Sequence, residues 1–299
     1  MEQLAGKVAV VTGAASGIGR ALAHRFAAEG MHLVLADIEA PPLAEAVEEL
    51  TASGAAAVGV VADVADAAAV ERLRDASVEA FGTVHVVCNN AGVSGGTGPV
   101  HELTTADWAW TLGVNLWGVI HGHQAFQPLL LAQGEGHIVN TASIAGHTAF
   151  PGMAPYNVAK HGVVALSETV YQELLAEASP VGISVLCPGF VSTRIMESDR
   201  NRPEALPRPL VAEEDPEREL FRALAREFFA GQKPPAEVAD LVVDAIRERR
   251  FYVFTDEVFD AHVAERHAWI QQADNPRRLG NLIEESLGLD PGALGAGGN

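Results

Sequence analysis

The residues best suited to proton transfer in this sequence are Tyr156 and Lys160, which lie four positions apart in a segment of helical character. Side chains at positions i and i+4 of a helix lie one above the other on the same face. A phenol with a pKa of about 10 is a poor base at neutral pH, but a neighbouring ammonium favours the phenolate and lowers that pKa. The same spacing also fits an ordinary surface pair, so other motifs must decide between the two interpretations.

Two further polar residues precede this pair at positions where they could act with it. Ser143 follows an apolar run, and Asn115 lies in an expected helix. A hydroxyl, an amide, a phenol and an ammonium together form a candidate acid/base site. The alternatives are that Ser143 caps a helix and that Asn115 is a buried polar residue that interrupts one.

A glycine cluster follows the first apolar run, in the order Thr12-Gly13-Ala14-Ala15-Ser16-Gly17-Ile18-Gly19. Gly13 permits a tight turn, Gly17 lets the backbone approach a pyrophosphate, and Gly19 allows close packing. The helix that follows offers its amides and the positive end of its dipole to a phosphate. Asp37, eighteen residues past Gly19, ends the second apolar run, where a carboxylate can accept ribose hydroxyls. Its alternative role is a helix N-cap before Pro41.

The spacing Gly-x-x-x-Gly-x-Gly resembles that of the compact branch of the short-chain dehydrogenase/reductase family. The resemblance covers about residues 5 to 195, because further motifs occur in the expected order. These are Asn89-Asn90-Ala91-Gly92, Asn115, Ser143, Tyr156-x-x-x-Lys160 and Pro188-Gly189. The chain is therefore expected to be an oxidoreductase that moves a hydride between a nicotinamide cofactor and a secondary alcohol or ketone.

The resemblance implies a role for each residue of the predicted catalytic set. Tyr156 would be the general acid/base, and Lys160 would lower its pKa and hold the ribose hydroxyls. Ser143 would donate a hydrogen bond to the substrate oxygen, and Asn115 would hold a water that links Lys160 to solvent.

The resemblance also implies a set of cofactor-binding residues. Asp63 and Val64 would contact adenine, Asn89 would stabilise the strand ends near the ribose, and Thr193 would meet the nicotinamide carboxamide. The complete predicted set is Gly13, Ser16, Gly17, Ile18, Gly19, Asp37, Asp63, Val64, Asn89, Ala91, Gly92, Tyr156, Lys160, Pro188, Gly189, Val191 and Thr193.

Asp37 predicts NAD rather than NADP as the cofactor, because its carboxylate would repel a 2'-phosphate. Neither Ala14 nor Ala15 offers a cation to such a phosphate. Arg20 is the residue that could weaken this argument, but on the first helix we expect it to face solvent or the pyrophosphate.

The expected substrate is apolar or aromatic. The loop 144–155 contains Phe150 and Met153, and Phe190, Ile195 and Met196 follow the sixth apolar run, which predicts an apolar pocket wall. His147 is the polar exception and is expected to be an exposed loop residue rather than a substrate contact. The wall and the insertion 194–235 faintly resemble those of aryl-alcohol dehydrogenases that act on lignin-derived ethers.

Short apolar runs that alternate with amphipathic segments must position these residues. Continuous apolar strands are covered by helices on both faces, so the pattern predicts an α/β fold with a doubly wound parallel sheet of about seven strands, the Rossmann fold. Helices are expected at 18–28, 42–52 and 67–80, followed by Gly30, Gly54 and Gly82. The expected strands lie at 8–11, 32–36, 57–61, 84–88, 137–140, 183–187 and 251–254.

The domain organisation is expected to be simple. Residues 1–275 form one catalytic domain with a substrate-lid insertion at about 194–235, and 276–299 form a partly disordered C-terminal extension. The compact branch usually has a glycine pair after its last strand, and Thr255-Asp256-Glu257 stands there instead. One tetramer interface of the family is therefore in doubt. The other, built from the helices that carry Asn115 and Tyr156, predicts a homodimer or homotetramer.

Composition excludes several classes of partner. The net charge of -19 disfavours nucleic acid and anionic membranes, and neither a signal sequence nor a long apolar span is evident. Cys88 and Cys187 both end apolar runs, so we expect reduced thiols in a cytoplasmic protein. The histidines do not form a metal motif, and we expect no metal.

Two rival functions remain to be weighed. A nucleotide-sensing binding protein without turnover would not need to retain Ser143, Tyr156 and Lys160 in register. An epimerase or dehydratase of the longer branch of the family would show different glycine spacing and a larger C-terminal substrate domain.

Overall fold

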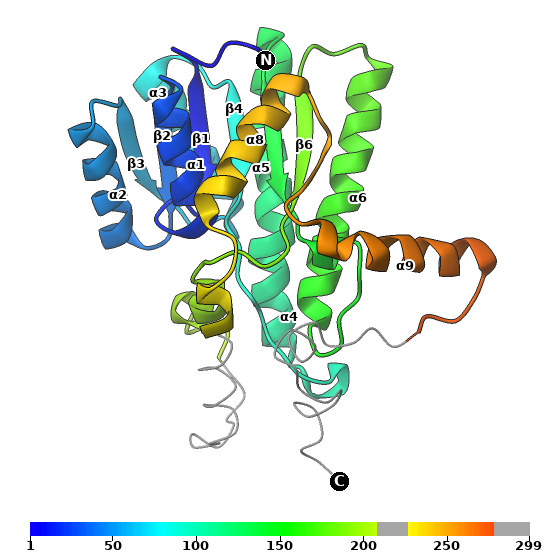
Figure 1. Ribbon diagram of the computed structural model, residues 1–299. Helices are drawn as coiled ribbons and strands as arrows, with labels where there is room; N and C mark the ends of the chain where they lie inside the picture. The colour runs from blue at the N-terminus through cyan, green and yellow to red at the C-terminus, as the bar shows by residue number, and fades with distance from the viewer. Residues whose placement is uncertain (208–226, 278–299) are drawn as a thin grey trace.

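The sheet at the centre of the molecule has seven parallel strands in the order β3-β2-β1-β4-β5-β6-β7, with helices on both faces (Figure 1). A computed structural model describes residues 1–207 and 227–277 of the chain. The predicted doubly wound α/β fold is confirmed. The strands are β1 Val8–Thr12, β2 His32–Asp37, β3 Ala57–Val61, β4 Val86–Asn89, β5 His137–Thr141, β6 Gly182–Cys187 and β7 Tyr252–Phe254.

The helices cover the sheet in two layers because the central strands are apolar on both faces. All residues of β1 and all residues of β6 are buried. Leu22, Leu43 and Val242 belong to the core on the face covered by α1, α2 and α8, and Leu73 and Phe126 to the core under α3, α5 and α6. The helices are α1 Gly17–Ala28, α2 Ala40–Ala52, α3 Ala67–Phe81, α4 Thr105–Leu112, α5 Gly118–Gln133, α6 Ala154–Ala176, α8 Pro235–Glu248 and α9 Asp260–Gln272.

Local sequence signals explain where the helices begin and end. The side chain of Asp66 caps α3 by accepting a hydrogen bond from the amide of Ala68 at 3.0 Å. Gly82 ends the same helix with a φ of 79°, a conformation that favours glycine. The sequence did not predict the π-helical turn Gly113–Trp117 that joins α4 to α5. This turn places Asn115 in the interior, where it is fully buried.

Strand β1 pairs with β2 on one side and with β4 on the other. The chain adds β2 and β3 on one side of β1 and β4 to β7 on the other, so the direction in which strands are added reverses between β1 and β4. In open parallel sheets, ligands bind at the carboxyl ends of the strands near such a switch point. The loops after β1, β2, β4, β5 and β6 therefore meet at one edge, and these loops carry the predicted site residues.

The first part of the predicted insertion at 194–235 is tied to the body of the molecule. It begins with a 3-10 helix, η4 (Ile195–Asn201), and the next residue, Arg202, forms a buried ion pair of 2.7 Å with Asp107 of α4. The guanidinium also lies over the ring of Trp110. The lid predicted for 194–235 falls partly on residues 208–226, outside the described residues, as does all of the predicted extension 276–299 beyond residue 277.

Helix α9 ends at Gln272 and extends away from the body of the molecule in Figure 1. Both cysteines are buried and carry free thiols. Within the described ranges, no helix combines the length and the apolarity that crossing a membrane requires.

Candidate active site

The glycine-rich loop between β1 and α1 is packed so tightly that side chains could not replace its glycines. A Cβ at Gly13 would lie 2.8 Å from the Cα of Ala91, and one at Gly19 would lie 2.1 Å from the carbonyl oxygen of Gly13. Gly17 has a φ of 53°. Ser16 is the N-cap of α1, but its side chain makes no capping hydrogen bond. The amides of the first turn of α1 can therefore donate to another acceptor. The loop therefore fits the pyrophosphate of a dinucleotide.

Asp37 lies at the end of β2 and faces this loop. Its Oδ2 accepts a hydrogen bond from the amide of Ala15 at 3.0 Å, and its Oδ1 accepts one from the amide of Glu39 at 3.0 Å. The N-cap of α2 is Glu39, so the alternative in which Asp37 caps that helix is wrong. Arg20 forms an ion pair with Glu49 of α2.

The other residues predicted near the adenosine lie after β3 and β4. Asp63 accepts a hydrogen bond from the amide of Ala65 at 2.9 Å. Val64 is buried and packs closely against Gly118, since a Cβ at Gly118 would lie 2.7 Å from Cγ2 of Val64. The side-chain amide of Asn89 donates to Oδ1 of Asn140 at 2.9 Å and so joins the ends of β4 and β5, as expected of a residue that stabilises the strand ends.

Asn90, which was not in the predicted set, joins the ends of three strands. Its side-chain amide donates to the carbonyl of Thr12 at 3.0 Å, and its Oδ1 accepts a hydrogen bond from Thr141 at 3.3 Å. The hydroxyl of Thr12 in turn accepts from the amides of Asn90 and Ala91. Both residues stand in the motifs that the sequence singled out, but only the topology shows that they touch.

Three of the predicted catalytic residues come together at the ends of β5 and in the first turns of α6. Ser143, Tyr156 and Lys160 are all buried. The ammonium of Lys160 lies 5.6 Å from the centre of the Tyr156 ring and donates a hydrogen bond to the carbonyl of Thr141 at 2.8 Å. Ser143 accepts a hydrogen bond from the amide of Ala145 at 3.1 Å, which is the local capping role considered as its alternative.

Burial dominates the electrostatics of this group. Desolvation raises the pKa of the Tyr156 phenol, and a hydrogen bond with Ser143 acts in the opposite direction. Desolvation also lowers the pKa of Lys160 to about 8. The sequence predicted that the ammonium would lower the pKa of the phenol. In the structure the effect of burial is larger, because the ammonium is engaged with Thr141 and is not hydrogen-bonded to the phenol oxygen.

Asn115 lies next to Lys160 across Gly92. A Cβ at Gly92 would be 3.4 Å from Oδ1 of Asn115 and 3.8 Å from the ammonium of Lys160. The Asn115 side chain accepts from the amide of Val93 and donates to its carbonyl, each at 2.8 Å. Both polar atoms of this side chain thus bind the backbone of Val93, and its expected part in holding a water that links Lys160 to solvent stays a prediction.

The segment after β6 closes the other side of the site. The carbonyl of Pro188 accepts from the amide of Ile144, which follows Ser143, at 2.9 Å, and the amide of Gly189 donates to Thr255 at 2.9 Å. Val191 is buried. Thr193 lies against the glycine-rich loop, since a Cβ at Gly17 would be 3.1 Å from its Cγ2.

An aromatic cluster lies beside Ser143, on the side of Ile144. Phe190 contacts the rings of Phe228, Phe229 and Phe259 at centre-to-centre distances of 4.9, 5.6 and 5.7 Å. Phe150 and Phe254 pack against the same cluster. His147 is buried, contrary to the expected exposed loop histidine, and its Nε2 lies 3.3 Å from the Sγ of Cys187. Desolvation lowers the pKa of His147 to about 4.

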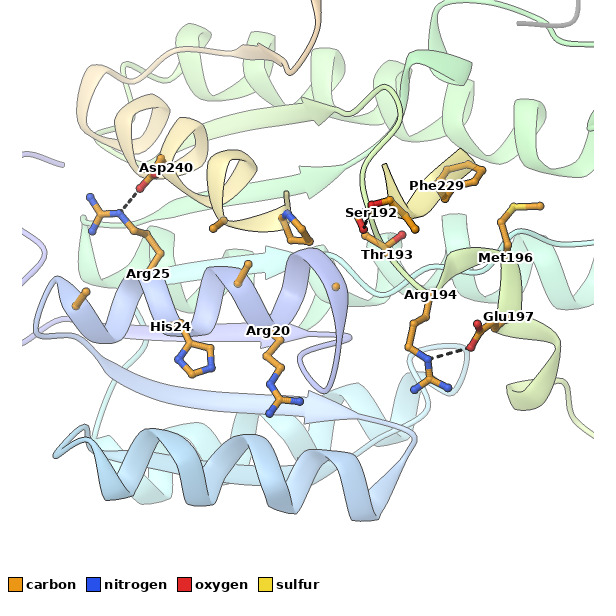
Figure 2. Close-up of a pocket in the computed structure, with 16 residues that line it drawn as sticks. Arg20, His24, Arg25, Ser192, Thr193, Arg194, Met196, Glu197, Phe229 and Asp240 are labelled. Carbon is orange, nitrogen blue, oxygen red and sulfur yellow. Dashed lines mark hydrogen bonds and ion pairs between the residues drawn. The ribbon is translucent and has the colours of Figure 1, made fainter. Parts of the chain in front are cut away.

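A groove of about 950 Å³ runs between α1, α8 and the segment after β6 (Figure 2). It contains Gly17 and Thr193 of the predicted cofactor site but none of the four predicted catalytic residues. Two of its arginines are paired with acids, Arg25 with Asp240 at 2.6 Å and Arg194 with Glu197 at 3.0 Å. The groove therefore borders the glycine-rich loop at Gly17 and does not reach the predicted catalytic residues. Among the described residues, no cluster of His, Cys, Asp or Glu could hold a metal ion.

Comparison with known proteins agrees with this geometry. The family model described as short chain dehydrogenase matches residues 7–204. The chain is 39% identical over 250 residues to a 1-deoxy-11-beta-hydroxypentalenate dehydrogenase of Streptomyces avermitilis, covering 83% of this chain and 84% of that protein. It is 36% identical over 204 residues to a C alpha-dehydrogenase of Sphingobium sp., covering 68% of this chain and 66% of that protein.

Among solved structures, a short chain dehydrogenase/reductase from Burkholderia phymatum in complex with NAD superimposes with a TM-score of 0.88 at 46% identity. That match covers 93% of this chain and 99% of the other.

Proposed function

This chain belongs to the short-chain dehydrogenase/reductase family, and from that premise we propose that it is an NAD-dependent oxidoreductase that interconverts a secondary alcohol and a ketone. The observation that carries the proposal is the burial of Ser143, Tyr156 and Lys160 together, beside Gly92 and at the same edge as the glycine-rich loop. A nucleotide-sensing protein without turnover would have no use for a buried phenol and ammonium, because burying either group without a task costs stability.

The cofactor, when bound, supplies the hydride acceptor or donor, and the residues supply the rest. Tyr156 takes the proton of the alcohol or returns it to the ketone, and Ser143 holds the same oxygen by a hydrogen bond. Lys160 binds ribose hydroxyls and, as a cation near the phenol, favours its ionisation. Asn115 acts as a positioning residue, because its amide fixes Val93 in the loop that follows β4.

The substrate class follows from the wall beside Ser143. Rings of Phe150, Phe190, Phe228, Phe229 and Phe259 favour an apolar or aromatic alcohol over a small polar one. The similarity to a C alpha-dehydrogenase supports an aromatic alcohol as the first candidate.

A panel of secondary alcohols and ketones, graded from aliphatic to aryl, tests this function. The purified protein is expected to reduce NAD with aryl alcohols at a higher kcat/KM than with short aliphatic ones, measured by the absorbance of the reduced cofactor. Binding of NAD with no turnover of any alcohol or ketone would favour the nucleotide-sensing alternative.

The assembly and the location of the protein are also proposals. A homodimer or homotetramer is supported by large apolar side chains on the outer faces of the helical segments around Asn115 and Tyr156, where Trp117 is 51% exposed and Val158 is 48% exposed. Two free, buried thiols support a cytoplasmic location.

Selection of NAD over NADP is expected to depend on Asp37. A 2'-phosphate would bring nearly two negative charges to within about 4 Å of its carboxylate, and each unit pair costs roughly 4 kcal/mol at an effective dielectric of 20 before solvent and salt reduce it. Even a quarter of that cost gives a preference of about fivefold or more. The wild type should therefore show a higher kcat/KM with NAD than with NADP on one alcohol.

Asp37→Ala combined with Ile38→Arg should shift this preference toward NADP, because it exchanges the carboxylate for a nearby cation. Wild-type kcat/KM values that are equal for the two cofactors, or higher with NADP, would show that Asp37 does not have this role.

A further inference from the structure

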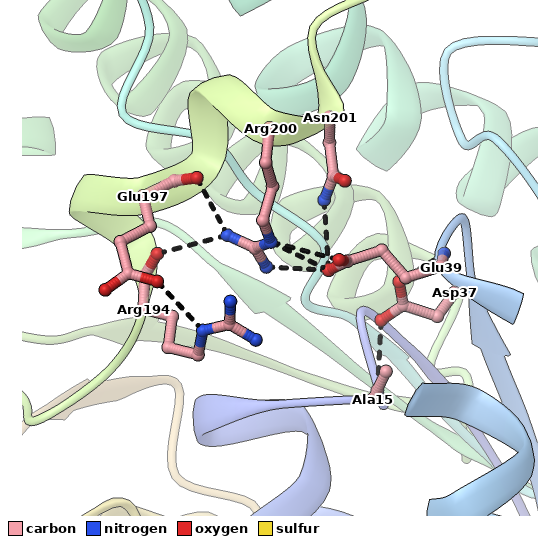
Figure 3. Close-up of polar contacts among 7 residues, drawn as sticks. All are labelled: Ala15, Asp37, Glu39, Arg194, Glu197, Arg200 and Asn201. Atoms are coloured by element: carbon pink, nitrogen blue, oxygen red, sulfur yellow. Dashed lines mark hydrogen bonds and ion pairs between the residues drawn. The ribbon is translucent and has the colours of Figure 1, made fainter. Parts of the chain in front are cut away.

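Five charged side chains gather where the loop after β2 meets η4. Asp37 is the last residue of β2 and Glu39 lies in the loop after it, while Arg194, Glu197 and Arg200 belong to the segment that follows β6 (Figure 3). Three acids and two bases give this cluster a net charge of -1 when all are ionised. It lies at the adenosine end of the proposed cofactor site, because Asp37 contacts the glycine-rich loop at Ala15.

The strongest contact in the cluster joins Glu39 to Arg200, which are 161 positions apart in the chain. The Nε of Arg200 lies 3.0 Å from one carboxylate oxygen of Glu39, and an NH2 nitrogen lies 2.6 Å from the other. Asn201 donates a further hydrogen bond to the same carboxylate at 3.2 Å. Both charged side chains are about three-quarters buried or more, with 26% of Arg200 and 20% of Glu39 exposed. The hydrogen bond from Arg200 lowers the pKa of Glu39.

The position of the Arg200 guanidinium is fixed from its own side as well. It donates to the carbonyl of Glu197 at 2.9 Å. Farther along the same segment, Ser198 accepts a hydrogen bond from the amide of Ser94 at 2.9 Å, and Arg202 pairs with Asp107. The segment thus crosses the mouth of the proposed cofactor site with several anchors, and it holds Arg200 within electrostatic range of Asp37.

An arginine in this position is what a 2'-phosphate would bind, since the guanidinium matches phosphate oxygens in charge and geometry. Arg200 would therefore work against the preference for NAD that Asp37 predicts, unless an acidic side chain binds its guanidinium. Glu39 binds this guanidinium with both of its carboxylate oxygens. Arg194 also has an acidic partner, but its pair with Glu197 is a single contact of 3.0 Å between side chains that are 52% and 40% exposed.

We propose that Glu39 is a second determinant of cofactor selectivity, which acts by holding Arg200 in an ion pair and so withholding this cation from a 2'-phosphate. The inference rests on the proposed function, because it assumes that the adenosine ribose lies beside Asp37. Glu39 is a specificity residue that acts through Arg200, and the two form one unit. Selectivity for NAD then has two parts, repulsion by Asp37 and the neutralisation of Arg200.

The test compares the wild type with three variants, and binding of NADH and NADPH is measured by the fluorescence of the reduced cofactor. Glu39→Gln keeps the shape of the side chain but releases Arg200, and it should lower the ratio of NADPH to NADH dissociation constants by about tenfold. Arg200→Gln leaves the Glu39 carboxylate unpaired and should raise that ratio or leave it unchanged. The double variant Glu39→Gln with Arg200→Gln should return to within about threefold of the wild type.

A matched control is Glu48→Gln, which removes the same charge from an exposed position farther along α2. It should leave the ratio unchanged. If the double variant kept the low ratio of Glu39→Gln, the loss of one negative charge would explain the result and the role of Arg200 would be wrong. If NADH bound tightly but Glu39→Gln left the ratio unchanged, the inference alone would be overturned. If the wild type bound neither cofactor, both this inference and the proposed function would be wrong.

Discussion

Replacement of Tyr156 by phenylalanine is expected to lower kcat for alcohol oxidation by about 100- to 10,000-fold, the usual contribution of a general acid/base. Phenylalanine keeps the buried ring and its packing and removes only the hydroxyl that transfers the proton. The dissociation constant of NAD should change by no more than a few fold, because in this account the hydroxyl acts on the substrate oxygen. Steady-state kinetics and a separate measurement of cofactor binding distinguish the two effects.

The pH dependence of this variant gives a second result. Burial raises the pKa of the Tyr156 phenol, so the wild-type rate of oxidation should rise with pH as the phenolate forms. The residual rate of Tyr156→Phe should lose that dependence. Tyr171→Phe is the matched control, since it removes a phenol from the exposed part of the same helix. Turnover by Tyr156→Phe within tenfold of the wild type would refute the catalytic assignment.

Lys160→Met is expected to weaken NAD binding and to lower kcat, each by about 10- to 100-fold. The ammonium is proposed to bind ribose hydroxyls and to favour the phenolate of Tyr156, and a hydrogen bond from a charged group is worth about 1.5–3 kcal/mol. Methionine fills most of the same buried space, so the loss of packing stays small. The ammonium also bonds the carbonyl of Thr141, so thermal unfolding of the variant should be recorded alongside.

Lys7→Met is the control, because it removes a lysine from the opposite end of β1, where it pairs with Glu135. It should leave both constants unchanged. A Lys160→Met protein that lost rate but bound NAD normally would show that Lys160 does not hold the ribose.

The fold could be predicted from the sequence because its elements carry strong local signals. The runs that became β1 and β6 are apolar without interruption, as a strand covered on both faces requires. Helix α3 is bounded by a capping aspartate and a left-handed glycine, and both ends were predicted to within a residue. Gly19 was interpreted correctly as a position of close packing, and Gly13, predicted to permit a tight turn, has a φ of 65°.

The features that could not be predicted depend on contacts between distant parts of the chain. The direction of the Asn89 side chain follows from Asn140 on the adjacent strand, and the burial of His147 depends on its contact with Cys187 of β6. A periodic pattern does not reveal a π-helical turn, whose widening at Asn115 depends on tertiary packing. The pairing of Glu39 with Arg200 spans most of the sequence, and nothing near either residue indicates its partner.

The direction in which the pKa of Tyr156 shifts could not be predicted from the sequence either. The spacing of Tyr156 and Lys160 predicts an ammonium near a phenol, and the structure has this arrangement. Whether the pKa of the phenol rises or falls depends on how deeply both groups are buried and on the acceptor that Lys160 finds. Depth of burial is a property of the assembled fold.

Transfer of label from alcohol to cofactor tests the central claim most directly. A secondary aryl alcohol that carries deuterium on its carbinol carbon is incubated with NAD and the wild-type protein, and the cofactor is examined by mass spectrometry. We predict reduced cofactor that contains one deuterium, together with an equal amount of ketone, and loss of both products in Tyr156→Phe. Cofactor that binds but stays oxidised and unlabelled with every alcohol that binds would contradict the account, because the buried set around Tyr156 would then not carry out hydride transfer.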